Sequence, residues 1–395
     1  MVFHAISFRA PAVTAGACRG SRLFSSETWE CMKHTVLHPA HESLGAKLAP
    51  FGGFVMPIQY SGILAEHYAA RNEAALFDTC HMGEFRIDGP HAVDDLQRLI
   101  SSDVASVKIG RCRNGFFCNE QGGVIDDLIV YRLGEQEFMI VVNAATQESD
   151  FEWVTGRLSP DTHAENVSDS TAKIDLQGPR APRILQELLG ASVADFKFYT
   201  HRTVTCDAGT LFISRTGYTG EIGFEMYCAL ADASRVWERC LELGAVPAGL
   251  GARDTLRLEM CYPLYGHELN AQRNAGESGF SRLIASNKEF IGSGIVTDTS
   301  RYKDALVPLV LEGRRAARQG DTIRGTGGEP LGEVTSGSYS PSLERAIALG
   351  YVRKERAEIG TEVLIAGKRN SIKGTIARKP LYDRGTFREP IDRFL

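Results

Sequence analysis

The chain of 395 residues is roughly two to three times as long as a typical domain, which predicts a sizeable core and more than one folded unit. Hydrophobic residues at 43% and charged residues at 24% are typical of soluble proteins and exclude a largely disordered chain. With 44 basic and 49 acidic residues, the formal charge of −5 gives no general attraction to nucleic acid or anionic membrane, and no apolar run approaches the ~18 residues that cross a bilayer.

The first 26 residues contain no acidic side chain, whereas Arg9, Arg19 and Arg22 lie among Ser, Ala and Phe. This composition is typical of mitochondrial import segments, with a disordered tail as the alternative. We therefore predict that residues 1–26 are a targeting segment and that the mature protein acts in the mitochondrial matrix.

The sequence gives little indication of a metal site. Its nine cysteines are scattered without the close pairs of zinc or redox motifs, so most are expected to be buried free thiols. His34, His38 and His41 are closely spaced, but Pro39 is expected to break the helix that would align them. We predict no metal cofactor.

Helix and strand patterns alternate through the first 300 residues. In chain order the predicted elements are a helix at 63–76, a strand at 85–88, a helix at 93–100, a hairpin of strands at 124–131 and 138–143, a helix at 182–189, strands at 211–214 and 224–227, and a helix at 231–243. This alternation predicts an α+β fold over residues 27–300.

Beyond about residue 300 the pattern changes to short β-rich runs separated by glycines. These runs lie at 306–311, 346–352, 362–365 and 371–376. They predict a separate β-barrel domain over residues 301–395.

Common nucleotide and hydrolase motifs are absent from the sequence. Gly249-Leu250-Gly251 begins like a dinucleotide fingerprint, but Asp254 stands where the third glycine would be. The chain also lacks G-x-x-x-x-G-K-S/T, H-E-x-x-H and G-x-S-x-G segments. The sequence therefore carries none of the usual motifs of phosphate-loop proteins, zincins or serine hydrolases.

Two adjacent carboxylates, Asp126 and Asp127, stand within the otherwise apolar strand at 124–131. Neighbouring side chains of a strand point to opposite faces, so one of the two is expected to face inward. A buried carboxylate needs partners because desolvation of its charge is costly. The pair is a candidate ligand-orienting site, with a structural hydrogen-bond network as the alternative.

A glycine-rich segment at 216–225 is a second candidate. Its three glycines within seven residues predict a tight loop on which Tyr218 and Glu225 converge. Glu225 could accept two donors from the edge of an amino-pyrimidine ring, and Tyr218 could supply a stacking face or a phenol. The alternative is a hairpin with a solvated glutamate.

A third candidate is the segment at 251–259, which begins like a helix after a glycine-rich turn. Arg253 at its start could meet a ligand. Asp254 and Arg257 are spaced i, i+3 and are expected to pair on the surface.

Together these segments resemble the aminomethyltransferase, or T-protein, family of the glycine cleavage system over residues 44–379. The matching blocks are 44–47, 50–53, 77–78, 81–82, 122–130, 142–144, 176–179, 217–225, 249–259, 264–266, 332–337 and 340–343. The resemblance implies a three-lobed fold around a folate-binding channel, with two lobes in residues 27–300 and a C-terminal β-barrel.

The resemblance also implies an activity and a site. The family transfers the methylene carbon of an aminomethyl group on lipoylated H-protein to tetrahydrofolate, which releases ammonia and gives 5,10-methylenetetrahydrofolate. H-protein is thus the expected partner and tetrahydrofolate the co-substrate. Asp127 takes the family's catalytic position, and Asp126 is expected to face away. The matching folate-site positions are Glu225, Arg253, Tyr218, Asn143 and Met82.

This sequence departs from the family pattern at several positions. Cys80 replaces a serine, Asn114 stands where a tyrosine is common, and Phe280 occupies a tryptophan position, so the pocket is expected to differ in shape. The usual tyrosine-rich ending is missing, and Tyr382 or Phe387 could supply its folate contact.

Two other functional classes share features with this family. A folate-binding accessory factor of iron–sulfur assembly would carry K-G-C-Y-x-G-Q-E, which this sequence lacks. A methylamine-demethylating enzyme would need an attached flavin domain, for which 395 residues leave no room. For the partner, Arg314, Arg315 and Arg318 form a basic cluster that could meet the acidic surface typical of H-proteins, with a solvated loop as the alternative.

Overall fold

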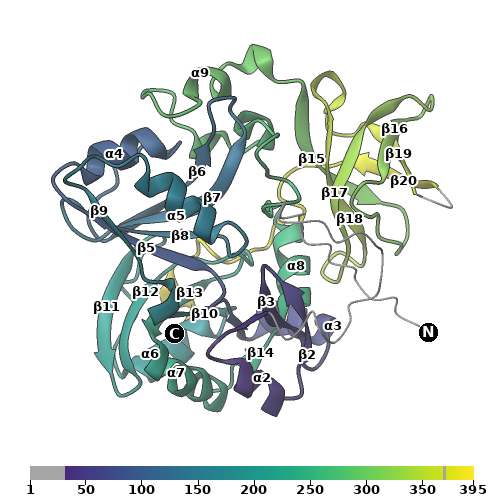
Figure 1. The fold of residues 1–395 in the computed structure, drawn as a ribbon. Coiled ribbons are helices and arrows are strands. Elements are labelled where there is room, and N and C mark those ends of the chain that lie inside the picture. Colours follow the sequence, from purple (N-terminus) through teal and green to yellow (C-terminus); the bar gives the residue numbers. More distant parts are fainter. Residues whose placement is uncertain (1–31, 368–370) are drawn as a thin grey trace.

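The computed structural model describes residues 32–367 and 371–395, so the targeting segment predicted at 1–26 lies outside the described residues. The described chain forms two large sheets, a small sheet and a closed barrel. Figure 1 shows the two large sheets on one side of helix α8 (Leu250–Glu259) and the barrel on the other. This mixed architecture with a C-terminal barrel confirms the predicted fold class.

The first large sheet has five strands. In spatial order they are β6 (Arg111–Cys118), β7 (Val124–Arg132), β8 (Glu137–Val142), β5 (Gly83–Asp88) and β9 (His163–Asn166). Its helices are α4 (Ala92–Leu99) and α5 (Gln147–Thr155). The apolar residues of both helices join the core of the sheet, which explains the helical spacing of apolar side chains near 93–100. β7 and β8 are antiparallel neighbours, which confirms the predicted hairpin.

The second large sheet has six strands. In spatial order they are β11 (His201–Cys206), β12 (Gly209–Ser214), β13 (Gly223–Ala229), β10 (Thr171–Gln177), β4 (Ala75–Asp78) and β14 (Val246–Pro247). Helices α6 (Ala181–Leu189) and α7 (Leu230–Glu242) pack against one face. Ala172, Ile174 and Leu176 of β10 enter this core. Because strand side chains alternate, Lys173 and Asp175 occupy the opposite face.

The small sheet contains β1 (Lys33–His34), β3 (Phe54–Gln59) and β2 (Lys47–Phe51), beside helices α2 (His38–Ser43) and α3 (Ile63–Asn72). The predicted helix at 63–76 is too long, because the chain leaves α3 after Asn72 and enters β4 at Ala75. The expectation that Pro39 breaks a helix is also wrong. Pro39 lies in the first turn of α2. Backbone N–H groups in a first turn have no acceptor within the helix, so proline is tolerated there.

The three closely spaced histidines do not converge. His34 stacks on His38 with ring centroids 3.9 Å apart, whereas the His41 Nε2 atom lies 2.7 Å from the Asp78 Oδ2 atom. Within residues 32–367 and 371–395, no group of three or more His, Cys, Asp or Glu side chains could hold a metal ion.

The barrel closes through six strands. In spatial order they are β15 (Asp304–Leu311), β18 (Arg345–Arg353), β17 (Pro330–Ser340), β16 (Thr322–Gly325), β19 (Glu362–Ala366) and β20 (Ser371–Ile376). The domain boundary at residue 301 stays a prediction.

Short helical turns complete the chain at η1 (Ser168–Ser170), η2 (Ala275–Ser278), η3 (Ser281–Leu283), α9 (Ser293–Val296), η4 (Thr299–Arg301), η5 (Lys354–Arg356) and η6 (Ile391–Phe394). Among the described helices, none is long and apolar enough to cross a membrane.

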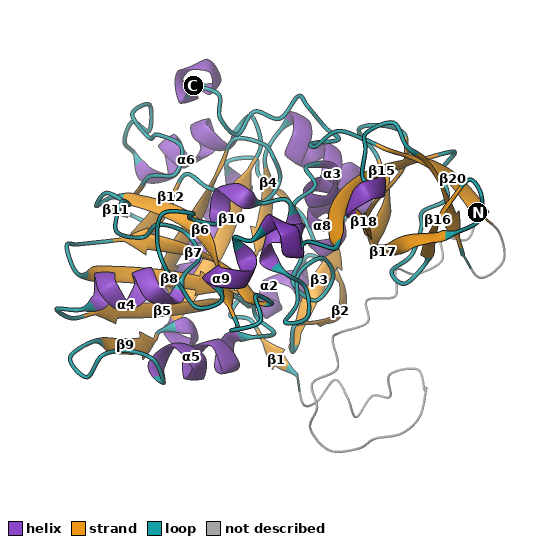
Figure 2. Cartoon of the chain, turned by 90° about the horizontal axis from the view of Figure 1, so that it is seen from above, coloured by secondary structure: helices purple, strands orange, loops and turns teal. Residues whose placement is uncertain are grey.

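A buried ionic network and the C-terminal tail tie these regions together. Arg71 of α3 bonds to Glu221 at 2.8 Å and to Glu259 of α8 at 2.7 Å, and Glu259 also accepts a hydrogen bond from Ser340 of the barrel at 2.5 Å. After the barrel the chain returns to α6, where Arg183 donates to the Leu395 carbonyl at 2.8 Å; Figure 2 shows this chain end beside α6. Buried ion pairs and hydrogen bonds therefore join α3, α8 and the barrel, and a hydrogen bond joins the chain end to α6.

Candidate active site

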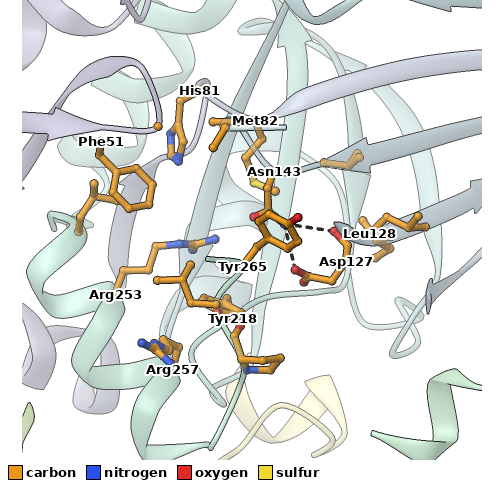
Figure 3. A pocket seen from close by; sticks show the side chains of 18 of the residues that line it. Phe51, His81, Met82, Asp127, Leu128, Asn143, Tyr218, Arg253, Arg257 and Tyr265 are labelled. Carbon is orange, nitrogen blue, oxygen red and sulfur yellow. Dashed lines mark hydrogen bonds between the residues drawn. The ribbon is translucent and has the colours of Figure 1, made fainter. Parts of the chain in front are cut away.

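A pocket lies between the two large sheets and α8. It is lined from β7, β8 and β13, from the first turns of α8, and from the segment at 263–267. All six residues that the family resemblance selected line it: Asp127, Glu225, Arg253, Tyr218, Asn143 and Met82. Figure 3 shows Asp127 and Arg253 projecting into it from opposite sides. Their roles stay predictions.

The β7–β8 hairpin positions the acidic end of the pocket. Ile129 pairs with Val141, so the same register carried two residues further places Asp127 opposite Asn143. The Asn143 Nδ2 atom donates to the Asp127 Oδ1 atom at 3.0 Å and to the Asp126 Oδ1 atom at 2.8 Å. Asp127 lines the pocket, whereas Asp126 is fully buried and does not.

The electrostatics of this end favour proton exchange at neutral pH. Burial, with the nearby Asp126 carboxylate, raises the pKa of Asp127 from 3.8 to about 7. Among the described residues, no cation forms an ion pair with Asp127. The carboxyl group can therefore take up or release a proton without a large change of pH.

The other end of the pocket alternates positive and negative charges. The Lys173 Nζ atom lies 2.6 Å from Asp175 Oδ1 and 2.9 Å from Glu225 Oε1. The Arg253 Nη1 atom lies 2.8 Å from Asp175 Oδ2. Although burial opposes its charge, Lys173 and Arg253 lower the pKa of Asp175, so this end keeps fixed charges at neutral pH.

Glu225 is almost completely buried at 8% exposure, so the alternative of a solvated glutamate is wrong. Its Oε1 atom accepts from Lys173. Its Oε2 atom accepts from the Thr216 hydroxyl and, at 3.2 Å, from the Tyr131 hydroxyl. The protein thus fixes the carboxylate in orientation before any ligand binds.

Tyr218 presents a ring and not a free phenol. Its hydroxyl donates to the Pro263 carbonyl, and its ring stacks on Tyr262 with centroids 5.7 Å apart. The guanidinium carbon of Arg253 lies 5.0 Å from the centre of the Tyr218 ring. Burial raises the pKa of Tyr218, so the phenol stays neutral.

The buried ion pair behind this end, formed by Lys173 and Asp175, was missed from sequence. Lys173 and Asp175 alternate with Ala172, Ile174 and Leu176 in β10, and that period of two was the signal that could have found them. The predicted pairing of Arg257 with Asp254 forms at 2.8 Å, but not on the surface. Arg257 is 1% exposed because Glu268, 3.0 Å away, supplies a second buried partner.

Two other neutral groups reach the pocket. His81 lines it, and burial lowers the pKa of His81 to about 4, so the ring is uncharged at neutral pH. Asn114, one of the three departures from the family pattern, also lines it, and its Oδ1 atom is buried without a hydrogen-bond partner among the described residues. This atom can accept a hydrogen bond from a ligand.

The remaining departures lie outside the pocket. Cys80 donates to the Lys173 carbonyl at 3.3 Å, and Phe280 packs between α8 and the barrel. Tyr382 lies over Arg71 with 4.0 Å between the guanidinium carbon and the ring centre, and Phe387 contacts Phe198 with ring centroids 5.5 Å apart. Neither aromatic residue of the tail lines the pocket, so the suggestion that one of them supplies the terminal folate contact is not supported.

The chain is similar to known proteins over most of its length. Residues 37–288 match the family model of the GCVT N-terminal domain, and residues 305–383 match that of the glycine cleavage T-protein C-terminal barrel domain. An aminomethyltransferase of Desulforamulus reducens is 41% identical over 363 residues, which are 89% of this chain and 99% of the relative. An aminomethyltransferase of Thermotoga maritima is 39% identical over 369 residues, covering 91% of this chain and all of the relative.

A solved structure has a similar fold over most of this chain. The crystal structure of glycine cleavage system aminomethyltransferase T from Bartonella henselae is 31% identical, with a TM-score of 0.85. The match covers 90% of this chain and 99% of that chain.

Proposed function

This chain belongs to the glycine cleavage T-protein family, and we propose that it transfers the methylene carbon of an aminomethyl group on lipoylated H-protein to tetrahydrofolate. The observation that carries the proposal is the convergence of six family-matched residues on one pocket. Flat aromatic faces, fixed carboxylates and a cation there suit an amino-pterin ring with an acidic tail.

In the proposed reaction the methylene carbon exchanges both of its bonds. Its bonds to the lipoyl sulfur and to the amine nitrogen break, and two bonds to folate nitrogens form, giving 5,10-methylenetetrahydrofolate. The two protons lost by the folate nitrogens go to the lipoyl thiolate and to the departing ammonia, so atoms and charges balance. Asp127 is suited to carry such a proton, because burial and Asp126 bring its pKa to about 7.

We assign binding and orientation to the other end of the pocket. Glu225 accepts hydrogen bonds, Tyr218 offers a ring face, and Arg253 offers positive charge. Their partners in the protein hold them in place, which reduces the entropy lost when folate binds. Met82 and Asn143 complete the lining.

We further propose that H-protein docks beside the barrel, at the exposed cluster of Arg314, Arg315 and Arg318. Gln319, in the same loop, donates to the Gly266 carbonyl at 3.4 Å. Tyr265 and His267, on either side of Gly266, line the pocket. An acidic partner bound at these arginines would therefore lie next to the pocket rim.

Location in the mitochondrial matrix is likewise a proposal. It is supported by the acid-free, arginine-containing composition of residues 1–26. The named relatives are bacterial, which counts against it. A fusion of residues 1–40 to a fluorescent protein should enter isolated mitochondria, and a fusion that stays outside would contradict the proposal.

An accessory role in iron–sulfur assembly is not favoured. The relatives matched over most of the chain are aminomethyltransferases, and the loop at 217–221 lacks the marker of the accessory factors.

The proposed function is tested by ammonia release from aminomethylated H-protein. Wild type should release ammonia only when tetrahydrofolate is present, with one 5,10-methylenetetrahydrofolate formed per ammonia. Release at an equal rate without tetrahydrofolate, or no release at all, would contradict the assignment.

A further inference from the structure

A second pair of carboxylates is buried behind the acidic end of the pocket. Asp126 of β7 and Asp150 in the first turn of α5 are both 0% exposed. They lie within hydrogen-bonding reach of each other. Neither lines the pocket, and neither forms an ion pair with a described Lys, Arg or His.

The two carboxylates have very different hydrogen-bond partners. Asp126 accepts two N–H groups of Asn143, from the backbone to Oδ2 at 2.8 Å and from Nδ2 to Oδ1 at 2.8 Å. Both oxygens of Asp150 are buried without a well-formed hydrogen bond, and the Thr146 hydroxyl, which faces both carboxyl groups, donates to the Asn143 carbonyl at 3.2 Å. An ionised Asp150 in this position would be desolvated, unpartnered and in contact with a second negative charge.

One proton between the two groups resolves this conflict. The proton belongs on Asp150, because Asp126 already accepts two donors as a carboxylate, and a neutral Asp150 can then donate to it. Burial and the Asp126 charge raise the pKa of Asp150 to about 10, in agreement with this assignment. The other titratable side chains that face the pair are Asp127 and Tyr265, both of them acids, and Glu268 faces Asp127.

We propose that Asp126 and Asp150 are positioning residues that share one proton, hold the Asn143 carboxamide against Asp127, and keep one fixed negative charge behind Asp127. The geometry itself does not depend on the proposed function, whereas its effect on aminomethyl transfer does. Asn143 is the link, since its Nδ2 atom also donates to Asp127 Oδ1 at 3.0 Å and to the Asp127 carbonyl at 3.2 Å.

The proposal predicts different effects on the pKa of Asp127 for Asp126→Asn and Asp150→Asn, although both replace a carboxyl group by a carboxamide of similar size. Asp126→Asn removes the fixed charge, so the pKa of Asp127 should fall by about 1–2 pH units. Asp150→Asn keeps a neutral donor to Asp126, so the pKa of Asp127 should stay within about 0.3 pH units of wild type. Asp150→Ala removes that donor, so Asp126 should take up the proton and the pKa of Asp127 should shift in the same direction as in Asp126→Asn.

The test is a ¹³C NMR titration of the Asp127 carboxyl in the full chain without substrates, for these three variants and for the exposed control Asp94→Asn. Thermal unfolding confirms that each variant is folded, and the two Asp150 variants decide the question if Asp126→Asn fails to fold. The proposal is overturned if Asp126→Asn leaves the Asp127 titration unmoved, or if Asp150→Asn and Asp150→Ala shift it equally.

Turnover then connects the pair to the reaction. In the ammonia-release assay, the acidic limb of the pH–rate profile should move to lower pH in Asp126→Asn and Asp150→Ala, and remain in place in Asp150→Asn. A limb that stays in place in all three variants would overturn the catalytic part. If wild type releases no ammonia, the proposed function fails, while the NMR titration still decides the proton-sharing pair.

Discussion

Each end of the pocket contains a key aspartate, and the two aspartates have opposite pKa shifts. At one end Asp127 stands beside Asp126 with a neutral carboxamide between them, and burial raises the pKa of Asp127 to about 7. Behind the other end Asp175 is fully buried, whereas Asp127 is half-buried, yet Lys173 and Arg253 lower the pKa of Asp175. Neighbouring charges thus decide whether a buried aspartate exchanges a proton or holds a fixed charge.

The difference extends to what each end contributes to stability. The ion-paired end is held by short contacts of alternating sign, so loss of one member leaves its partners buried and unpaired. The acidic end concentrates like charges, which opposes folding whenever they ionise. Substitutions at the two ends should therefore change stability with opposite sign.

The largest expected effect is that of Lys173→Met. It leaves Asp175 and Glu225 without their shared cation, so the free energy of unfolding should fall by about 3–5 kcal/mol. Urea denaturation at pH 8 measures this effect. A loss below about 1 kcal/mol would contradict a stabilising role of the buried ion pairs at this end.

The matched variant at the other end is Asp127→Asn. The raised pKa means that Asp127 favours folding most below pH 3.8, and this contribution is lost as pH rises through about 7. At pH 8 the variant should be as stable as wild type or more stable, because it no longer buries an ionised carboxylate. Urea denaturation showing a clear loss of stability at pH 8 would contradict the assignment of an unpaired charge there.

Arg253→Gln should weaken binding more than folding. Loss of a charged donor in the pocket costs about 1.5–3 kcal/mol, which corresponds to a rise of about 10–100-fold in the Kd for tetrahydrofolate. Titration calorimetry measures the Kd. The control is Arg86→Gln, which breaks an exposed pair with Glu137 and should leave the Kd unchanged. Equal effects of both variants would remove Arg253 from the binding site.

His81 lies in the pocket lining and adds a dependence of stability on pH. Burial lowers its pKa from 6.5 to about 4, so the unfolded chain binds a proton between these values and the folded chain does not. Stability is therefore full above pH 6.5 and is lost as pH falls toward 4. In His81→Phe, urea denaturation at pH 7.5 and 5 should show a smaller loss; a loss equal to that of wild type would contradict a neutral, buried His81.

The smallest expected effect lies outside both ends. Reversal of charge at Arg314, Arg315 and Arg318 should raise the KM for H-protein several-fold at low salt, less so at high salt, without changing kcat. The control is Arg239→Glu on α7, an exposed arginine far along the chain from the cluster. Steady-state kinetics at two salt concentrations measure this, and an unchanged KM would dismiss the docking surface.

Much of the fold was predictable because local patterns determine it. The β7–β8 hairpin and four of the barrel strands follow from apolar runs bounded by turns, whereas the Gly- and Ser-rich strand β17 does not have that pattern. Alternation alone required one of Asp126 and Asp127 to face inward, and the family resemblance selected Asp127. The same rule applied to β10 would have found Lys173 and Asp175. Burial of Arg257 was not predictable, because i, i+3 spacing is the same on a surface and in a core.

The central claim is that Asp127 exchanges the proton during transfer. The most direct measurement is the pH dependence of single-turnover ammonia release at saturating tetrahydrofolate, in wild type and Asp127→Asn. Wild type should gain rate through an apparent pKa near 7, and the variant should be slower by about 10²–10⁴-fold with no such limb. A variant that keeps the rate of wild type, or keeps the limb near pH 7, would contradict the claim.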